Sequence, residues 1–95
     1  MTGKQRAYLR SMCNTMDALI YVGKEGVTEA LIHSVDEAVT ARELIKLGVQ
    51  RGAPLTAREA CTALCEALGA EPVQCIGNKF CIYRPDPEEP VIRLP

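Results

Sequence analysis

The chain has few of the residues on which catalytic sites and base-stacking surfaces depend. Its 95 residues include no tryptophan, one phenylalanine, three tyrosines and one histidine, His33. So few aromatic side chains argue against a single-strand platform of the kind built on exposed aromatic sheets. His33 has carboxylates nearby at Asp36 and Glu37, but the adjacent Ser34 points about 100 degrees around the predicted helix. The segment therefore does not predict a catalytic triad, and we expect His33 on a solvated helix face.

The sequence also lacks a C-x-x-C motif, although it contains five cysteines. A structural zinc site needs four ligands and usually such a tight pair, so we expect no metal. The odd number of cysteines and the absence of an apolar export segment predict a reduced, cytoplasmic protein. In that setting the cysteines are expected to act as small buried hydrophobic residues. They are Cys13, Cys61, Cys65, Cys75 and Cys81.

Neither a long apolar run nor an excess of positive charge is present. No segment approaches the roughly 18 apolar residues of a membrane span, so no membrane partner is expected. Eleven Lys and Arg against twelve Asp and Glu give a net charge of -1, which excludes a global positive field; a nucleic-acid partner would need a local basic patch. A chain of 95 residues forms one domain with little room for a catalytic cavity. We expect a monomer that is not an enzyme.

The N-terminal third predicts a helix followed by a strand. Thr2 and Gln5 form a capping box, and an apolar stripe at spacings of three and four extends to Met16. This pattern indicates an amphipathic helix. Residues 18–22 are a continuous apolar run, which is typical of a central strand buried on both faces.

A turn at residues 23–26 leads into a second helix, for which Thr28 is the expected N-cap. The apolar period then changes to two over residues 43–49. This alternation predicts a strand with one apolar face and one more polar face. Lys46 is expected on the polar face, away from the apolar row.

The C-terminal half predicts a third helix and a hairpin. Thr56 and Glu59 form a second capping box, and Gly69 is the expected helix stop. Strands are expected at residues 73–76 and 79–83, because Gly77-Asn78 between them suits a type II′ turn. That turn predicts three facing pairs: Cys75 with Phe80 and Val73 with Ile82 on one side, and Gln74 with Cys81 on the other.

These elements predict an α/β fold with the order α-β-α-β-α-β-β. Strand-helix-strand links favour parallel neighbours and the hairpin adds an antiparallel pair, so we expect two layers with a mixed four-stranded sheet. The expected domain spans residues 1–84. Residues 85–95 contain four prolines and three acidic residues, which predicts an extended acidic tail without regular structure.

The turn Gly23-Lys24-Glu25-Gly26 follows a predicted strand and precedes a capped helix. Free N–H groups at a helix start favour an anion, and glycines allow the backbone to approach it closely. The turn matches neither the P-loop nor the dinucleotide-binding pattern, so no nucleotide cofactor is expected. A G-x-x-G at a helix start clamps the nucleotide backbone in KH-type RNA binders. Taken alone, the motif is more simply explained as a tight turn.

Other motifs in the sequence favour the RNA-binding interpretation of this turn. They are Val22-Gly23-Lys24-Glu25-Gly26-Val27-Thr28, Glu43-Leu44-Ile45-Lys46-Leu47 and Ile76-Gly77-Asn78-Lys79-Phe80-Cys81-Ile82-Tyr83-Arg84-Pro85. In this order they resemble the CRM domain (chloroplast RNA splicing and ribosome maturation) in its stand-alone bacterial form, the YhbY-like proteins. The opening residues 4–10 also look like that family's first helix, so the resemblance covers essentially the whole chain.

The resemblance implies a fold similar to the C-terminal domain of translation initiation factor three, and a function without catalysis. The implied partner is ribosomal RNA within precursors of the large ribosomal subunit. Position by position, the resemblance points to the Gly23–Gly26 loop, Lys46 and Arg84. From the residues themselves we add the N-cap Thr28 and three arginines near the first helix and the second strand. The predicted RNA-binding residues are therefore Gly23, Lys24, Gly26, Thr28, Lys46, Arg42, Arg6, Arg10 and Arg84.

Two other functions stay open at this point. The first is a protein-protein adaptor that contacts ribosomal proteins through the sheet edge or the tail, where Val91, Ile92 and Leu94 could add to a sheet. The second is a small enzyme with Cys13 or Cys81 as a thiol nucleophile, which rests on the number of cysteines alone.

Overall fold

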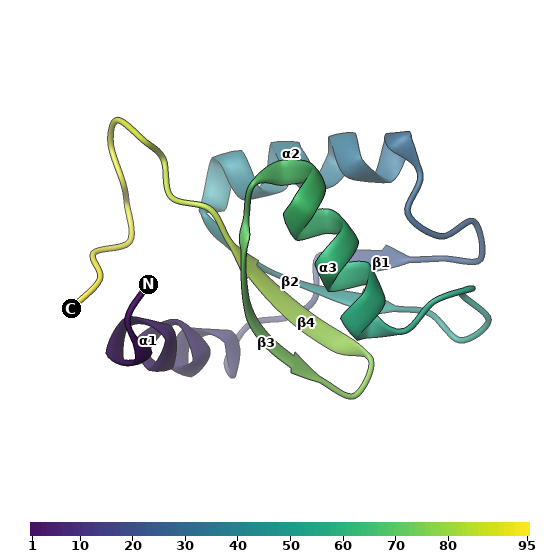
Figure 1. The fold of residues 1–95 in the computed structure, drawn as a ribbon, viewed down its shortest axis with the longest axis horizontal. Coiled ribbons are helices and arrows are strands. Elements are labelled where there is room, and N and C mark those ends of the chain that lie inside the picture. Colours follow the sequence, from purple (N-terminus) through teal and green to yellow (C-terminus); the bar gives the residue numbers. More distant parts are fainter.

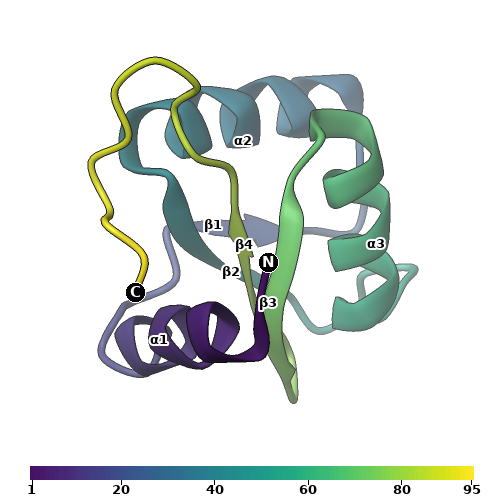
Figure 2. The ribbon, with the colours of Figure 1, turned by 60° about the vertical axis from the view of Figure 1, so that its left-hand side comes forward.

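The computed structural model describes residues 1–95 and confirms the predicted order of elements (Figure 1). The strands form one mixed sheet in the order β1-β2-β4-β3, in which only β1 and β2 are parallel. Helices α2 and α3 pack on one face of the sheet, and α1 covers part of the other (Figure 2). The elements are α1 (Gly3–Cys13), β1 (Ile20–Val22), α2 (Glu29–Arg42), β2 (Leu44–Val49), α3 (Ala57–Leu68), β3 (Glu71–Ile76) and β4 (Lys79–Tyr83).

Threonine caps start all three helices, as the sequence predicts. Thr2 and Thr56 form reciprocal capping boxes, and the Thr28 hydroxyl oxygen accepts a hydrogen bond from the N–H of the residue three positions on. Each cap satisfies a backbone donor that the helix itself leaves free. Helix α1 ends at Cys13, one turn before the predicted stripe does, but Met16 still packs against the sheet.

The prediction that residues 18–22 form a central strand is wrong, because β1 lies at the edge of the sheet. Val22 is buried, but Tyr21 is 42% exposed and Leu19 is 44% exposed. A short apolar run predicts a strand, but it does not show which strands lie beside it in the sheet. Strand β2 occupies the centre instead, and its expected polar face is largely covered, with Leu44 only 3% exposed.

The hairpin turn has the predicted geometry. Gly77 has a φ of 60°, and Asn78 has no positive φ, a combination that fits a type II′ turn and not type I′. Two of the three predicted pairs are confirmed: Gln74 lies opposite Cys81, and Cys75 lies opposite Phe80.

The third predicted pair, Val73 with Ile82, is wrong. A β-bulge between Pro72 and Gln74 shifts the register, so that Pro72 lies opposite Ile82. Proline has no N–H to donate to a ladder and is tolerated on edge strands and at bulges. The bulge turns Val73 to the α1 side of the sheet, where it is 5% exposed.

Two apolar cores result, one on each face of the sheet. The larger core joins α2 and α3 to the sheet and contains Phe80, Ile82 and Leu64. The smaller core, under α1, contains Leu9 and Cys13. The longest helix has 14 residues, and no helix combines the length and apolar character needed to cross a membrane.

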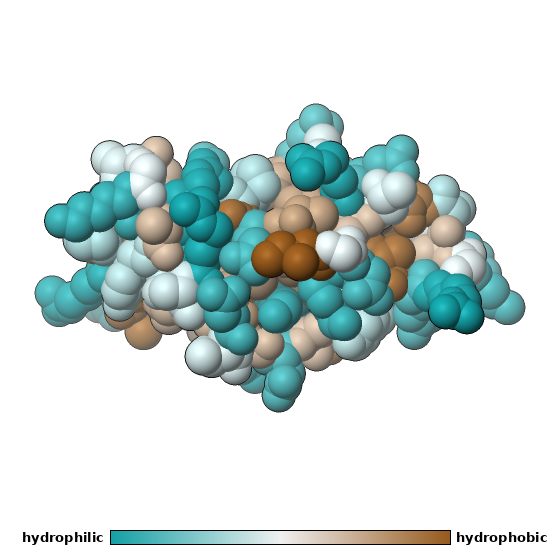
Figure 3. All heavy atoms as spheres, turned by 90° about the horizontal axis from the view of Figure 1, so that it is seen from below, coloured by the Kyte–Doolittle hydropathy of each residue, from teal (hydrophilic) through white to brown (hydrophobic).

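Helix α1 leaves part of its side of the sheet uncovered. Over the covered part, Leu44, Cys81 and Tyr83 are buried. Near the hairpin turn, by contrast, Tyr21 and Ile76 remain 42% and 65% exposed. Figure 3 views the molecule from this side and shows an apolar patch near its centre, bordered by hydrophilic side chains.

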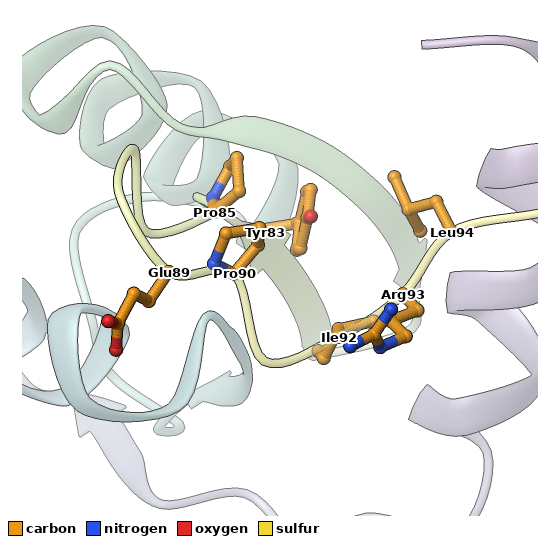
Figure 4. Close-up of a pocket in the computed structure, with 7 residues that line it drawn as sticks. All are labelled: Tyr83, Pro85, Glu89, Pro90, Ile92, Arg93 and Leu94. Atoms are coloured by element: carbon orange, nitrogen blue, oxygen red, sulfur yellow. The ribbon is translucent and has the colours of Figure 1, made fainter.

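The tail at residues 85–95 contains no helix or strand, as predicted, but it folds back on the domain. Ile92 and Leu94 pack against the core under α1, and the Gln5 amide donates a hydrogen bond to the Pro95 carbonyl at 3.2 Å. Figure 4 shows the hollow, of about 630 Å³, that the tail forms around Tyr83 at the end of β4.

One buried carboxylate, Glu43, holds this tail in place. Its Oε1 accepts the N–H groups of Val91 and Ile92 at 3.0 and 2.7 Å, and its Oε2 accepts the N–H of Asp86 at 2.7 Å. Glu43 is 1% exposed and has a φ of 67°, an uncommon conformation for a residue with a side chain. This role was not visible in the sequence, where Glu43 reads as the start of a strand.

Candidate nucleic-acid interface

The Gly23–Gly26 turn is a tight turn that presents Lys24 to solvent. The Gly26 N–H donates to the Gly23 carbonyl at 3.0 Å, so Lys24 and Glu25 form the exposed tip. Gly26 has a φ of 73°, and a Cβ on it would lie 3.2 Å from Cγ of Pro54. Only glycine fits this position without strain.

Helix α2 begins directly after the turn. The Thr28 Oγ1 accepts the N–H of Leu31 at 3.1 Å, while the hydroxyl hydrogen stays available to donate. The N–H groups of the first helical residues, Glu29 and Ala30, have no acceptor within the helix. Together with the positive end of the helix dipole, these donors can hold an anion, although the Glu29 carboxylate in the same turn reduces the positive potential.

A second turn lies beside the first. The Gln50 N–H donates to the Val22 carbonyl at 2.8 Å, and the Ala53 N–H closes a turn on the Gln50 carbonyl at 3.2 Å. Arg51, at the tip of this turn, is exposed. Both turns lie at the same end of the molecule (Figure 1), because the carboxyl ends of the parallel strands β1 and β2 meet at one edge of the sheet.

The hairpin turn between β3 and β4 is tied to the same region. The Val49 N–H donates to the Asn78 carbonyl at 2.8 Å, and the Asn78 amide donates back to the Val49 carbonyl at 3.2 Å. Lys79 follows directly and is partly buried. We call Lys24, Arg51 and Lys79 the loop-end cations. None of them is in an ion pair, since the three ion pairs of the structure involve other residues.

Sequence reasoning missed Arg51 and Lys79 as site residues. The signals were present, because Arg51-Gly52-Ala53-Pro54 is a turn-forming pattern directly after the second predicted strand and Lys79 lies in the third family motif. What was missing was the arrangement in space, which brings the turn at Arg51 beside the Gly23–Gly26 turn and ties the hairpin turn to the end of β2.

The basic residues predicted on the α1 side lie away from the loop end. The Lys46 ammonium donates to the Cys13 carbonyl at 3.3 Å, between β2 and α1. Arg6 donates to the Pro72 carbonyl and lies 3.9 Å from the Glu71 carboxylate. Arg10, in the last turn of α1, is exposed.

Arg42 and Arg84 lie at the opposite end of α2 from the Gly23–Gly26 turn. A helix of 14 residues is about 21 Å long, so no single phosphate can contact both ends. Arg84 also makes contacts within the protein, at 2.8 Å to Asp36, 2.7 Å to the Thr40 hydroxyl and 2.9 Å to the Leu68 carbonyl. The structure therefore groups Gly23, Lys24, Gly26 and Thr28, but not the remaining predicted residues.

The two cysteines considered as nucleophiles are not accessible to solvent. Cys13 and Cys81 are 0% and 1% exposed, and their thiols contact each other. The hydrogen bond to the Cys13 thiol, together with burial, raises the pKa of Cys81 and keeps it protonated. The thiol-enzyme hypothesis therefore has no support in the structure. His33 is exposed and lies 3.5 Å from the Glu37 carboxylate, as a solvated helix face predicts.

Side chains that commonly bind metals are not clustered in the structure. No group of three or more His, Cys, Asp or Glu side chains is arranged so that it could hold a metal ion. Cys61 and Cys65, one turn apart on α3, lie in the larger core. What the loop end offers is a set of backbone and hydroxyl donors with the exposed Lys24 and Arg51 on the two adjacent turns, which suits a phosphate group.

The sequence is similar to those of known proteins over its full length. The chain is 36% identical over 95 residues to the Bacillus subtilis protein named "Probable RNA-binding protein YqeI", covering 100% of this chain and 99% of that protein. It is 30% identical over 95 residues to a Haemophilus influenzae protein named "RNA-binding protein", covering 100% and 95%.

The fold is shared as well. The solution structure of SAV1595 from Staphylococcus aureus has a TM-score of 0.82 and 39% sequence identity to this chain, covering 100% of this chain and 99% of that one. The model of the CRS1 / YhbY (CRM) domain matches residues 1–84, which contain the Gly23–Gly26 turn and all three motifs noted in the sequence up to Arg84. The chain therefore belongs to the CRS1/YhbY (CRM) domain family.

Proposed function

We propose that this protein binds structured RNA through the loop end of the domain. The observation that carries the proposal is the Gly23–Gly26 turn, which places an exposed Lys24 beside the free N–H groups of α2 in a member of the CRM family. The names of the relatives, which describe RNA-binding proteins, support the same function.

In the proposed complex a backbone phosphate lies against the Gly23–Gly26 turn. The first N–H groups of α2 and the Thr28 hydroxyl donate hydrogen bonds to its oxygens. Lys24 and Arg51 flank this phosphate, and Lys79 meets a neighbouring one. Gly26 keeps the turn tight, so that the RNA backbone reaches the helix start without meeting a side chain.

Such contacts fix the position of the RNA without reading its sequence. Shape and unpaired bases then supply the selectivity, as is usual for proteins that bind structured RNA. An RNA that extends along the α1 side would also meet Arg10 and Lys46. We assign no contact with the same phosphate to Arg42 and Arg84, because they lie at the other end of α2.

A substitution of Lys24 tests the phosphate site. Lys24→Ala is expected to weaken binding to all RNAs alike and to lower the slope of log K against log salt by about one unit. The matched control is Arg42→Ala, which removes another exposed cation at the opposite end of α2. Fluorescence anisotropy over a salt series measures both slopes. Equal slopes for the parent protein and Lys24→Ala would show that Lys24 does not contact the RNA.

We further propose that the RNA is ribosomal, within precursors of the large subunit in the cytoplasm, as the family resemblance implies. The test is sedimentation of tagged protein from growing cells through sucrose gradients at low and high salt. Co-migration with large-subunit precursors that is released by salt is the expected result. Protein that remains at the top of the gradient at both salts would contradict the ribosomal assignment.

The adaptor hypothesis is the second candidate. The tail would have to leave the domain first, because Ile92 and Leu94 are packed against the core under α1. Val91, which is 79% exposed, and the two edge strands β1 and β3 remain available for a protein partner. Deleting residues 86–95 separates the candidates: loss of ribosome association with unchanged RNA affinity would favour the adaptor.

A further inference from the structure

The uncovered part of the sheet on the α1 side contains one ordered row of side chains. The strand registers place Tyr21 beside Gly48, Gly48 beside Lys79 and Lys79 beside Ile76. The row therefore crosses all four strands on the face opposite α2 and α3. We call these four residues the Tyr21 row.

The Tyr21 ring packs against Gly48 in this row. A Cβ on Gly48 would come within 2.5 Å of Cε2 of the Tyr21 ring, so only a glycine lets the ring rest on β2. The Lys79 ammonium lies 5.5 Å from the centre of the ring, within the range of a cation-π contact. The ring thus packs against the backbone of β2 beside Lys79, and 42% of the residue remains exposed to solvent.

The surroundings of the ring are positive and polar. Lys46 belongs to the next row on the same face, and neither it nor Lys79 is in an ion pair. Between the two lysines is a hollow of about 190 Å³ that is also lined by the amide side chains of Asn14 and Gln74. The Gln74 amide donates to Asn14 Oδ1 at 3.4 Å, and the remaining donors and acceptors of the two amides lie beside two ammonium groups that have no carboxylate partner.

We propose that the Tyr21 row binds one unpaired nucleotide, whose base stacks on Tyr21 and points its polar edge toward the Asn14 and Gln74 amides. Lys79 and Lys46 neutralise the flanking phosphates. This inference rests on the proposed function, since it places an unpaired base next to the phosphate site. Gly23 follows Tyr21 by two residues, about 7 Å along the strand, so an RNA held at the turn passes over the ring.

Charge decides between nucleic acid and an apolar protein segment as the occupant. An apolar segment would bury the Lys46 and Lys79 ammonium groups without a counter-charge, which is costly. A nucleotide supplies both a flat aromatic surface and the negative charge. The small number of aromatic residues argues against a platform for several bases, but one ring is sufficient for one base.

The test compares two substitutions of Tyr21 on two probes. Tyr21→Leu removes the ring, and Tyr21→Phe keeps it. The probes are single-stranded oligoadenylate and a blunt duplex RNA of equal charge, titrated by fluorescence anisotropy. Because stacking of one base contributes about 5- to 150-fold in affinity, Tyr21→Leu is expected to weaken binding of oligoadenylate by that factor and to leave duplex binding unchanged. Tyr21→Phe is expected to bind both probes as the parent protein does.

Failure of this inference is distinguishable from failure of the proposed function. If Lys24→Ala weakens both probes while Tyr21→Leu weakens neither, the nucleotide site is refuted and the phosphate site stands. An equal loss on both probes with Tyr21→Leu would also refute stacking. If the parent protein binds neither probe, the proposed function fails and this inference with it. Thermal melting of both variants, with midpoints near that of the parent protein, verifies that the exposed position tolerates the change.

Discussion

The tail contact at Glu43 yields a stability prediction that follows directly from the structure. Glu43→Ala removes a buried carboxylate that accepts three backbone N–H groups of the tail. Hydrogen bonds to a charged group contribute about 1.5–3 kcal/mol each. Part of this gain is offset by the desolvation of the carboxylate and by the ordering of the tail. We therefore expect Glu43→Ala to lower the free energy of unfolding by about 2–4 kcal/mol.

Glu43→Gln gives a finer comparison. The side-chain oxygen of glutamine can still accept the N–H groups of Val91 and Ile92, but its NH₂ group would face the N–H of Asp86, donor against donor. The expected loss is about 1–3 kcal/mol, the cost of one buried donor without an acceptor. Urea denaturation followed by circular dichroism measures both variants.

A double-mutant cycle decides whether the tail is the reason for these losses. The second change is a chain that ends at Arg84, so that every acceptor contact of Glu43 with the tail is absent. In that shortened chain Glu43→Ala is expected to cost less than about 0.5 kcal/mol, the scatter for independent sites. A loss in the shortened chain as large as in the full chain would refute the argument, because Glu43 would then act within the domain.

Two further predictions concern the glycine turn and the acidic tail. Gly26→Ala is expected to lower the free energy of unfolding by about 1–2 kcal/mol, because Gly26 has a positive φ. Gly3→Ala, in open space on α1, is expected to raise it by about 0.5–1 kcal/mol. Urea denaturation measures the size and the sign of both changes. The N–H groups of Glu89 and Glu88 lower the pKa of Asp86 below its usual 3.8. The stability that this carboxylate contributes is present above pH 3.8 and is lost as pH falls through the lowered pKa. An NMR titration of Asp86 measures this pKa, and a midpoint above 3.8 would contradict the turn geometry.

Local signals in the sequence predicted the elements of this fold well. A threonine cap needs only its own helix, so Thr2, Thr28 and Thr56 were all found by their spacing. The hairpin register was right close to the Gly77-Asn78 turn, where chain connectivity imposes it. It failed at Pro72, because a bulge depends on which strand lies at the edge.

Contacts between distant residues were the part that the sequence did not reveal. Glu43 meets backbone groups 43 to 49 residues further along the chain, and no periodicity encodes that contact. In the candidate site the Gly23–Gly26 turn was predictable, because a glycine turn before a helix cap depends only on residues that are adjacent in the sequence. The approach of Arg51 to this turn, and the attachment of the hairpin turn before Lys79 to the end of β2, depend on strand order, which the apolar run at residues 18–22 could not supply.

The position of the tail explains how a chain of net charge -1 can carry an RNA site. The longest dimension of the molecule is 38 Å, and Figure 1 shows the tail at one end of this axis and the two loop-end turns at the other. Exposed charges further apart than about 8 Å are largely screened at physiological salt. The carboxylates of Asp86, Glu88 and Glu89 therefore have little effect on a phosphate at Lys24 while Glu43 holds the tail. The field at the proposed phosphate site is set by the loop-end cations and the nearby carboxylates of Glu25 and Glu29, and not by the net charge.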